Sequence, residues 1–143
     1  IEKNLFAGIY NEEIFRELKN KKNKIVIKDS ISKKKISISI DKFYLKNDNA
    51  IVISNNNTLI FTKYRKPFHY LSDFRELNIN LKKYKILIVK SGYLSPELKK
   101  LKADNFMILT DGFVTQDFKR IKNLFREKPI YPFQKNFRYN IAI

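Results

Sequence analysis

The 143-residue sequence contains no cysteine and a single histidine, His69. Without cysteine, the chain has no disulfide framework, no thiol nucleophile and no cysteine-ligated zinc or iron–sulfur site. One histidine is too few for a histidine-rich metal centre or for the paired-histidine helix of zinc peptidases. A catalytic zinc normally takes three protein ligands, and no acidic cluster makes up the shortfall here. The sequence therefore predicts no metal site and no cofactor in this chain.

Long apolar runs and targeting signals are also missing. No run approaches the ~18–20 apolar residues of a transmembrane helix, and no signal peptide opens the sequence, so we expect a cytoplasmic protein without a membrane partner. Apolar residues make up 43% of the sequence, too many for a disordered chain. At this length we expect one domain over residues 1–143. Because the sequence begins at Ile1 rather than at methionine, we expect it to be a piece of a longer protein.

Acidic residues are scarce, with 14 Asp and Glu against 30 Lys and Arg and a net charge of +16. Lysine supplies 24 of the basic residues, and the excess is spread over the chain as +6 in residues 1–46 and +10 in residues 47–143. A binding stripe should be concentrated, so this charge is mainly compositional. The segment Tyr64–Tyr70 nevertheless interleaves basic and aromatic residues. It is either a turn with its aromatics in the core or, as the alternative function, part of a small nucleic-acid-binding module.

The hydrophobic pattern predicts a mixed α/β (α+β) fold. Antiparallel hairpins fill the N-terminal half, and a βαβ unit with parallel strands fills the C-terminal half. The continuous apolar runs at 86–89 and 106–109 are the expected parallel strands, each covered on both faces. The other predicted elements are helices over 11–22 and 71–77, strands over 24–31 and 36–41, a hairpin of 50–53 with 58–61, a helix starting at Ser95-Pro96-Glu97, a short helix after Thr115 and an extended tail over 129–133.

Two acidic patterns invite a catalytic interpretation that the sequence does not favour. Glu12 and Glu13 are paired like a general acid and base, but they fall in the first turn of a predicted helix, where acids favour the helix dipole. Glu97-Leu98-Lys99 resembles the end of a metal-dependent nuclease motif. It lies on a predicted helix rather than on a strand, and lysine-rich sequence produces such matches by chance. We therefore predict no catalytic residue in this chain.

The three glycines mark the candidate ligand-facing loops. Gly92 and Gly112 each follow one of the two predicted parallel strands, and Gly8 precedes the first helix. The carboxyl ends of parallel strands form the usual ligand-facing edge of an α/β sheet, where backbone N–H groups and a lysine can hold an anion. Alternatively, each glycine only permits a positive φ. The residues predicted to face a cleft are Lys90, Ser91, Gly92 and Tyr93, followed by Asp111 and Gly112.

The segment Tyr84–Leu98 closely resembles the C-terminal domain of MlrC-type metallopeptidases, the microcystin-degradation protein family. Three further segments match in the same order: Leu5–Tyr10, Arg65–His69 with the Asp73-Phe74-Arg75 that follows, and Leu109–Val114 with the later Lys128–Phe133. Asp111 departs from the family's usual Thr-Pro-Gly-Phe phrase.

This resemblance implies a C-terminal domain of a zinc metallohydrolase that binds no metal itself. Its partner would be the N-terminal domain of the same protein, which would hold the zinc and the catalytic acids, and the substrate would be peptide-like or a small molecule. The domain would pack on that partner and shape its substrate cleft. A third interpretation is a non-catalytic interaction domain left after separation from the enzyme half.

Overall fold

The computed structural model describes residues 2–20, 23–29, 33–90 and 95–108. The chain divides into two compact units, residues 1–105 and 106–143. The fold described below is that of the first unit. The predicted helix after Thr115 and the extended tail over 129–133 lie outside the described residues. The prediction of one domain over the whole chain therefore stays a prediction.

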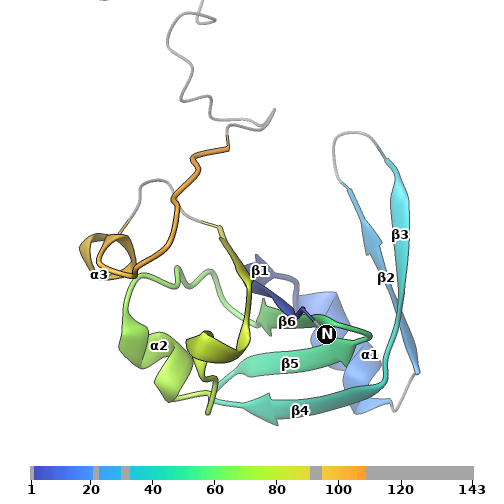
Figure 1. Cartoon of the computed structure of the whole chain (residues 1–143). Helices are drawn as coiled ribbons and strands as arrows, with labels where there is room; N and C mark the ends of the chain where they lie inside the picture. Colours follow the sequence, from blue (N-terminus) through green and yellow to red (C-terminus); the bar gives the residue numbers. More distant parts are fainter. Residues whose placement is uncertain (1, 21–22, 30–32, 91–94, 109–143) are drawn as a thin grey trace, which may run out of the picture. The chain divides into compact units, whose positions relative to one another are not determined.

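A five-stranded mixed sheet lies at the centre of the first unit, in the order β4-β5-β6-β1-β7 (Figure 1). β1 is parallel to both of its neighbours, β6 and β7, whereas β4, β5 and β6 pair antiparallel. This combination confirms the predicted α+β class with parallel and antiparallel pairing. The strands of this sheet are β1 (Asn4–Tyr10), β4 (Lys42–Lys46), β5 (Asn49–Ser54), β6 (Asn57–Thr62) and β7 (Ile86–Val89).

A separate two-stranded sheet and short helices complete the unit. The second sheet is the antiparallel hairpin of β2 (Lys24–Lys28) and β3 (Lys35–Ser39). The helical segments are α1 (Glu12–Lys19), α2 (Leu71–Arg75), the 3-10 turn η1 (Leu81–Lys83) and α3 (Pro96–Lys99). The predicted helix starts are confirmed: the side chain of Asn11 accepts from the backbone N of Ile14, and that of Ser95 accepts from the backbone N of Leu98, both at 3.1 Å.

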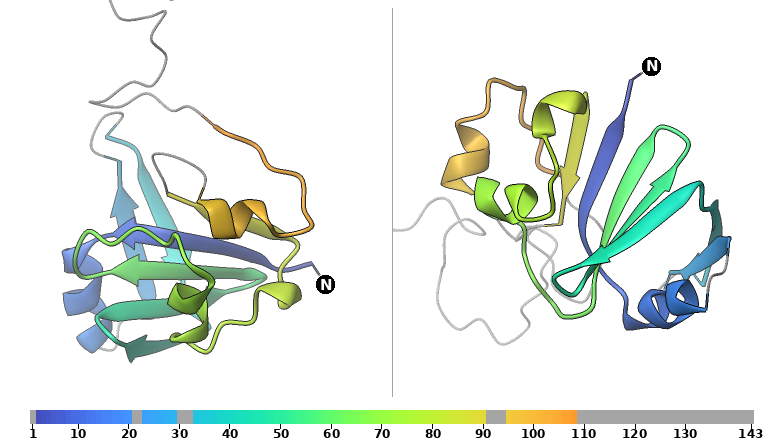
Figure 2. Two further views of the ribbon diagram at one scale, coloured as in Figure 1. Left: turned by 90° about the vertical axis from the view of Figure 1, so that its left-hand side faces the viewer. Right: turned by 90° about the horizontal axis from the view of Figure 1, so that it is seen from below.

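Both faces of the five-stranded sheet are covered, because its central strands alternate apolar side chains to either side. In Figure 2, α1 lies on one face and α2 with α3 on the other. The α2-side core consists of Leu5, Ala7, Ile51, Ile60, Phe68, Phe74, Leu77, Ile79 and Leu98. The α1-side core consists of Ile14, Phe15, Leu18, Ile25, Ala50, Val52, Leu59 and Phe61.

The sheet's tight turns use residues that tolerate a left-handed backbone. β4 and β5 are joined by Asn47 and Asp48, whose φ values of +48° and +55° give the two-residue turn that suits the twist of a hairpin. In the β5–β6 turn, Asn55 has a φ of +50°. Asparagine and aspartate enter this region more easily than other non-glycine residues, so the predicted β5–β6 hairpin is confirmed with its Asn triplet at the turn.

Two predictions about the parallel strands are wrong. Phe106, Met107 and Ile108 have no regular secondary structure, so the described part of the 106–109 segment is not a strand, and β7 pairs with β1 instead. Within the part of the chain that the structure describes, β7 is also covered on one face only, because Ile86 and Ile88 are 50% and 45% exposed. The physical reason is that α1 packs over β5 and β6, and the α1-side core of the described residues includes no residue of β7.

Candidate ligand-facing edge of the sheet

Four strands of the central sheet end at the same edge. β6, β1 and β7 are mutually parallel and end at Thr62, Tyr10 and Val89, and β4, which is parallel to β6 through two antiparallel pairings, ends there as well. We call this the carboxyl edge. The chain that leaves β6 crosses it as an irregular loop, Lys63–Tyr70, before α2 begins. This is the position at which open α/β sheets bind ligands.

At Gly8, β1 lies next to both the Lys63–Tyr70 loop and the end of β7. Gly8 has a φ of +82° and lies where the pairing of β1 with β6 slips by one residue, which is a β-bulge. A Cβ placed on Gly8 would lie 3.7 Å from the backbone oxygens of Lys66 and Lys90 and from a ring carbon of Phe68. These are ordinary contact distances, so glycine is needed here for its backbone angle rather than for space.

Of the residues predicted to face a cleft, the structure places one. Lys90 follows β7 at the carboxyl edge, its side chain is exposed, and its backbone N donates to the carbonyl oxygen of Ala7 at 3.1 Å. Ser91, Gly92, Tyr93, Asp111 and Gly112 lie outside the described residues. Their assignment to a ligand-facing loop stays a prediction, whereas Lys90 is at the predicted end of its strand.

Cations stack on aromatic rings along the edge. The guanidinium carbon of Arg65 lies 5.2 Å from the centre of the Tyr10 ring, and the Nζ of Lys63 lies 4.9 Å from the centre of the Tyr64 ring. A side-chain hydrogen bond to Tyr64 is the largest cause that raises the pKa of Lys63 above its usual value. The edge therefore presents fixed positive charge where three parallel strands end.

Asp73 fastens the Lys63–Tyr70 loop to the start of α2. Its Oδ2 accepts from the backbone N of His69 at 3.1 Å and from that of Tyr70 at 2.9 Å. Its Oδ1 lies 3.0 Å from the Nζ of Lys66, and Asp73 is only 8% exposed. One buried carboxylate thus satisfies two backbone donors and one ammonium group, which fixes the loop in place.

A second polar junction links α3 to the same loop. The carboxylate of Glu97 accepts from the backbone N of Leu71 at 2.7 Å, so a residue of α3 caps the start of α2. The hydroxyl of Ser95 donates to the carbonyl oxygen of His69. The acid of the nuclease-like Glu97-Leu98-Lys99 pattern lies on a helix, as predicted, and its carboxylate accepts a hydrogen bond at the start of α2.

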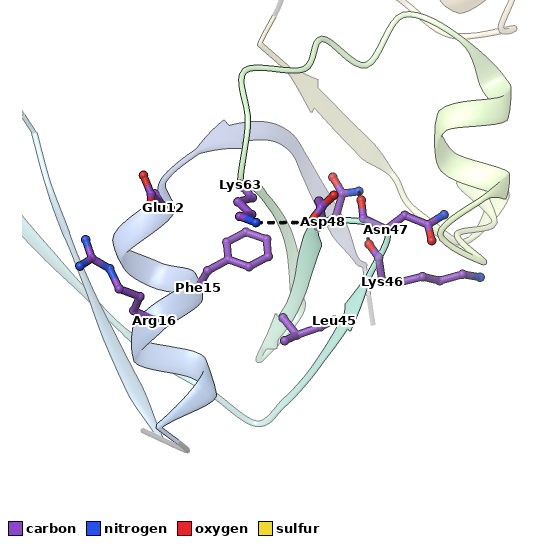
Figure 3. A pocket seen from close by; sticks show the side chains of 9 residues that line it. Glu12, Phe15, Arg16, Leu45, Lys46, Asn47, Asp48 and Lys63 are labelled. Carbon is purple, nitrogen blue, oxygen red and sulfur yellow. Dashed lines mark hydrogen bonds and ion pairs between the residues drawn. The ribbon is translucent and has the colours of Figure 1, made fainter.

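A shallow cleft of about 290 Å³ opens on the α1 side of the carboxyl edge (Figure 3). Its apolar part comes from Phe15 of α1 and Leu45 of β4, and an ion pair between Lys63 and Asp48, with N and O 3.8 Å apart, crosses its rim. The remaining lining residues are Glu12, Arg16, Lys46, Asn47 and Asn49. Sequence reasoning missed this cleft, because its residues come from three separate segments and one of them, β4, was not predicted.

The described residues offer no metal centre and no membrane span. Among them, no group of three or more His, Cys, Asp or Glu side chains converges as metal ligands would. His69 lies in the loop, with its ring edge-on to Tyr70 at a centroid distance of 6.5 Å. No helix in the described part of the chain is long and apolar enough to cross a bilayer.

Comparison with known protein families identifies the family to which the chain belongs. The model of the family described as MlrC C-terminus matches residues 27–123, more than half of the chain. The chain belongs to the MlrC C-terminal family. No curated protein and no solved structure shows a significant match. The resemblance noted in the sequence is thus confirmed at the level of the domain family.

The matched segment of this MlrC C-terminal domain contains the Lys63–Tyr70 loop, Asp73 and Lys90, so most of the carboxyl edge belongs to the family's own domain. β1 and α1 precede the matched segment, although β1 is a central strand of the sheet. In MlrC-type proteins this domain is the C-terminal part, so an N-terminal part of the same protein is its partner.

Proposed function

We propose that this MlrC C-terminal domain packs against the metal-bearing N-terminal domain of an MlrC-like zinc metallohydrolase and lines part of its substrate cleft with the carboxyl edge. One observation carries the proposal. Segments that resemble the family, although far apart in sequence, come together at this edge, with Gly8 in contact range of the backbones of Lys66 and Lys90. A surface formed by several segments that resemble the family is where we expect a function common to the family.

The chemistry of the edge suits an anionic group of a peptide-like substrate. Arg65 and Lys90 are exposed there and carry charge that carboxylates and phosphates bind well. The hydrogen bonds of Asp73 hold the loop that carries Arg65, so that little ordering is needed when a ligand binds. In this proposal a zinc ion held by the partner domain would supply the Lewis-acid chemistry for hydrolysis, and this chain would bind and orient the substrate.

A nucleic-acid-binding role for the Tyr64–Tyr70 segment has less support. Phe68 is fully buried, as expected for a turn that sends an aromatic into the core, whereas Tyr64 and Tyr70 are exposed. Lys63 is paired with Asp48, and Lys66 is paired with Asp73. These cations already have partners within the chain, so fewer of them are available for phosphates, which supply most of the affinity in nonspecific binding.

Zinc added to the isolated chain is expected to leave its melting temperature unchanged and its peptidase activity at background. The reason is that the described residues lack a set of three ligands and the sequence has only one histidine. Isothermal titration with Zn²⁺ and differential scanning fluorimetry check this. Stoichiometric zinc binding at submicromolar affinity would contradict the placement of the metal in the partner domain.

Lys90→Ala in the full-length two-domain protein is expected to raise KM about tenfold and to change kcat less than about twofold, because it removes a charge that binds substrate in the ground state and in the transition state alike. Lys85→Ala is the matched control, since Lys85 is an exposed lysine just before the other end of β7. Zinc content, measured by atomic absorption, should be the same in both variants. Equal KM and kcat values for the two variants would contradict the proposal that Lys90 binds substrate in the cleft.

A further inference from the structure

The shallow cleft beside α1 has a wall that the chain's own hydrogen bonds hold in place. This wall is the turn between β4 and β5, where Asn47 and Asp48 have positive φ values. The side chain of Asn49, which is only 4% exposed, donates to the backbone oxygen of Lys46 at 3.3 Å. The backbone N of Lys63 donates to the backbone oxygen of Asp48 at 3.0 Å, which ties the turn to the end of β6. The cleft is therefore formed before a ligand binds, and this lowers the cost of ordering it.

Two apolar side chains form the floor of the cleft. Phe15 of α1 is 8% exposed and points toward Lys63, whereas Leu45 of β4 is 42% exposed and points toward α1 (Figure 3). Arg16 and Lys46, which also line the cleft, point away from the floor in the same view. An aliphatic group placed between Phe15 and Leu45 would be removed from water together with the exposed part of Leu45, which is favourable.

The rim of the cleft carries one positive and one negative charge, Lys63 and Asp48, which we call the rim pair. The Nζ of Lys63 lies 3.8 Å from the Oδ1 of Asp48, and the two side chains are 41% and 63% exposed. A charge-assisted hydrogen bond between such groups is about 2.7–2.9 Å long, so the rim pair is not closed by one. The ammonium group has three donors, and a hydrogen bond to Tyr64 uses one of them. Both members of the rim pair therefore keep hydrogen-bonding capacity for a ligand.

We propose that this cleft binds a free α-amino acid with an apolar side chain. The carboxylate and the ammonium group of an amino acid are neighbours, as the two charges of the rim pair are. The ligand's carboxylate accepts from the Nζ of Lys63, its ammonium group donates to the carboxylate of Asp48, and its side chain lies on the floor. Ligand pockets commonly measure about 300–1,000 Å³. The volume of about 290 Å³ is at the small end of this range and suits a ligand of this size.

Other ligands fit the rim pair and the floor less well. A simple anion meets the negative charge of Asp48, and the charge of Glu12 also acts on Lys63. A purely apolar ligand would take water from the rim pair without replacing its hydrogen bonds. An internal residue of a longer peptide has neither of the two free charges. The proposed site uses neither Arg65 nor Lys90 and needs no partner domain, so it does not depend on the proposed function.

L-Leucine titrated into the 143-residue chain tests the proposal. In ¹H–¹⁵N NMR spectra, the amides of residues 45–49 and 63 should shift and saturate at millimolar leucine, whereas those of η1 should not shift. Glycine lacks the side chain and N-acetyl-L-leucine lacks the ammonium group, so each should bind at least about fivefold more weakly. Equal binding of either compound, or an absence of saturable shifts with L-leucine, would overturn the proposal.

Variants of the rim pair and of the floor supply the second test. Asp48→Asn should weaken leucine binding about fivefold because it removes the negative charge, and asparagine tolerates the positive φ of this turn. Leu45→Ser should also weaken it about fivefold, because it removes the exposed part of the floor. The matched controls are Asp104→Asn and Ile88→Ser, at exposed positions outside the cleft, and each should weaken binding less than about twofold.

The dispersion of the NMR spectrum checks that each variant is folded. If the two control variants weaken binding as much as Asp48→Asn and Leu45→Ser do, leucine binds nonspecifically and the proposal is wrong. The proposed function fails separately, if Lys90→Ala and its control have equal kinetics in the full-length protein.

Discussion

Replacing Phe68 with alanine is expected to lower the free energy of unfolding by about 3–5 kcal/mol. Phe68 is fully buried although it comes from an irregular loop, and the centre of its ring lies 5.3 Å from that of Phe74 in α2. The truncation leaves a cavity in the α2-side core, next to the bulge at Gly8. Urea denaturation followed by circular dichroism measures the change.

Tyr70→Ala is the matched control for this prediction, because Tyr70 lies two residues further along and is 58% exposed. It should cost less than about 0.5 kcal/mol. Phe68 is also the anchor that holds the Lys63–Tyr70 loop on the sheet, so its loss should broaden the NMR signals of Arg65 and Lys66 before global unfolding. A loss below about 1 kcal/mol for Phe68→Ala would mean that the loop does not depend on this ring.

Asp73→Ala is expected to cost about 2–4 kcal/mol. The substitution leaves the backbone N–H groups of His69 and Tyr70 without their acceptor in a half-buried place and removes the carboxylate that pairs with Lys66. Asp73→Asn keeps one acceptor oxygen and should cost about half as much. The same denaturation experiment measures both.

Asp104→Ala is the control for Asp73, since it removes the same group from an exposed position. It should change the free energy of unfolding by less than about 0.5 kcal/mol. Hydrogen exchange at the amides of residues 69 and 70 separates the role of Asp73 as a backbone hydrogen-bond acceptor from its role as the ion-pair partner of Lys66. Faster exchange in Asp73→Ala but near-normal exchange in Asp73→Asn supports the backbone clasp, and equal, unchanged exchange in both contradicts it.

The elements that the sequence predicted correctly are those with local signals. Asn11 and Ser95 cap their helices through contacts within three residues, and the Asn triplet makes its turn within one hairpin. β1 and β4 were missed as strands. β1 is a strand because it lies between β6 and β7, which follow it far along the chain. Such pairing depends on tertiary contacts that no local pattern contains.

The same distinction holds for the candidate site. The position of Lys90 directly after β7 was predicted from a local signal, the apolar run over 86–89 followed by the glycine loop, whereas its role in a ligand-facing loop stays a prediction. The stack of Arg65 on Tyr10 was not found, since these residues are brought together only by the parallel pairing of β1 with β6. The prediction that both faces of β7 are buried was wrong for a related reason. An apolar run shows which side chains a strand is able to bury, but which of them are buried depends on the elements that pack against the strand.

The bulge at Gly8 gives β1 a change of phase. Before the bulge, Leu5 and Ala7 point into the α2-side core and Phe6 points into the α1-side core. After the bulge, Ile9 packs with the α1-side core, whereas strict alternation would place it on the α2 side with Leu5 and Ala7. The bulge thus moves the odd-numbered positions of β1 from the α2-side core, where Leu5 and Ala7 lie, to the α1-side core, where Ile9 packs. The extra residue at the bulge also fixes the face of the sheet on which the side chain of Tyr10 lies, and Tyr10 contacts Arg65 at the end of the strand. The geometry of the carboxyl edge therefore depends on the number of residues in β1 as well as on their chemistry.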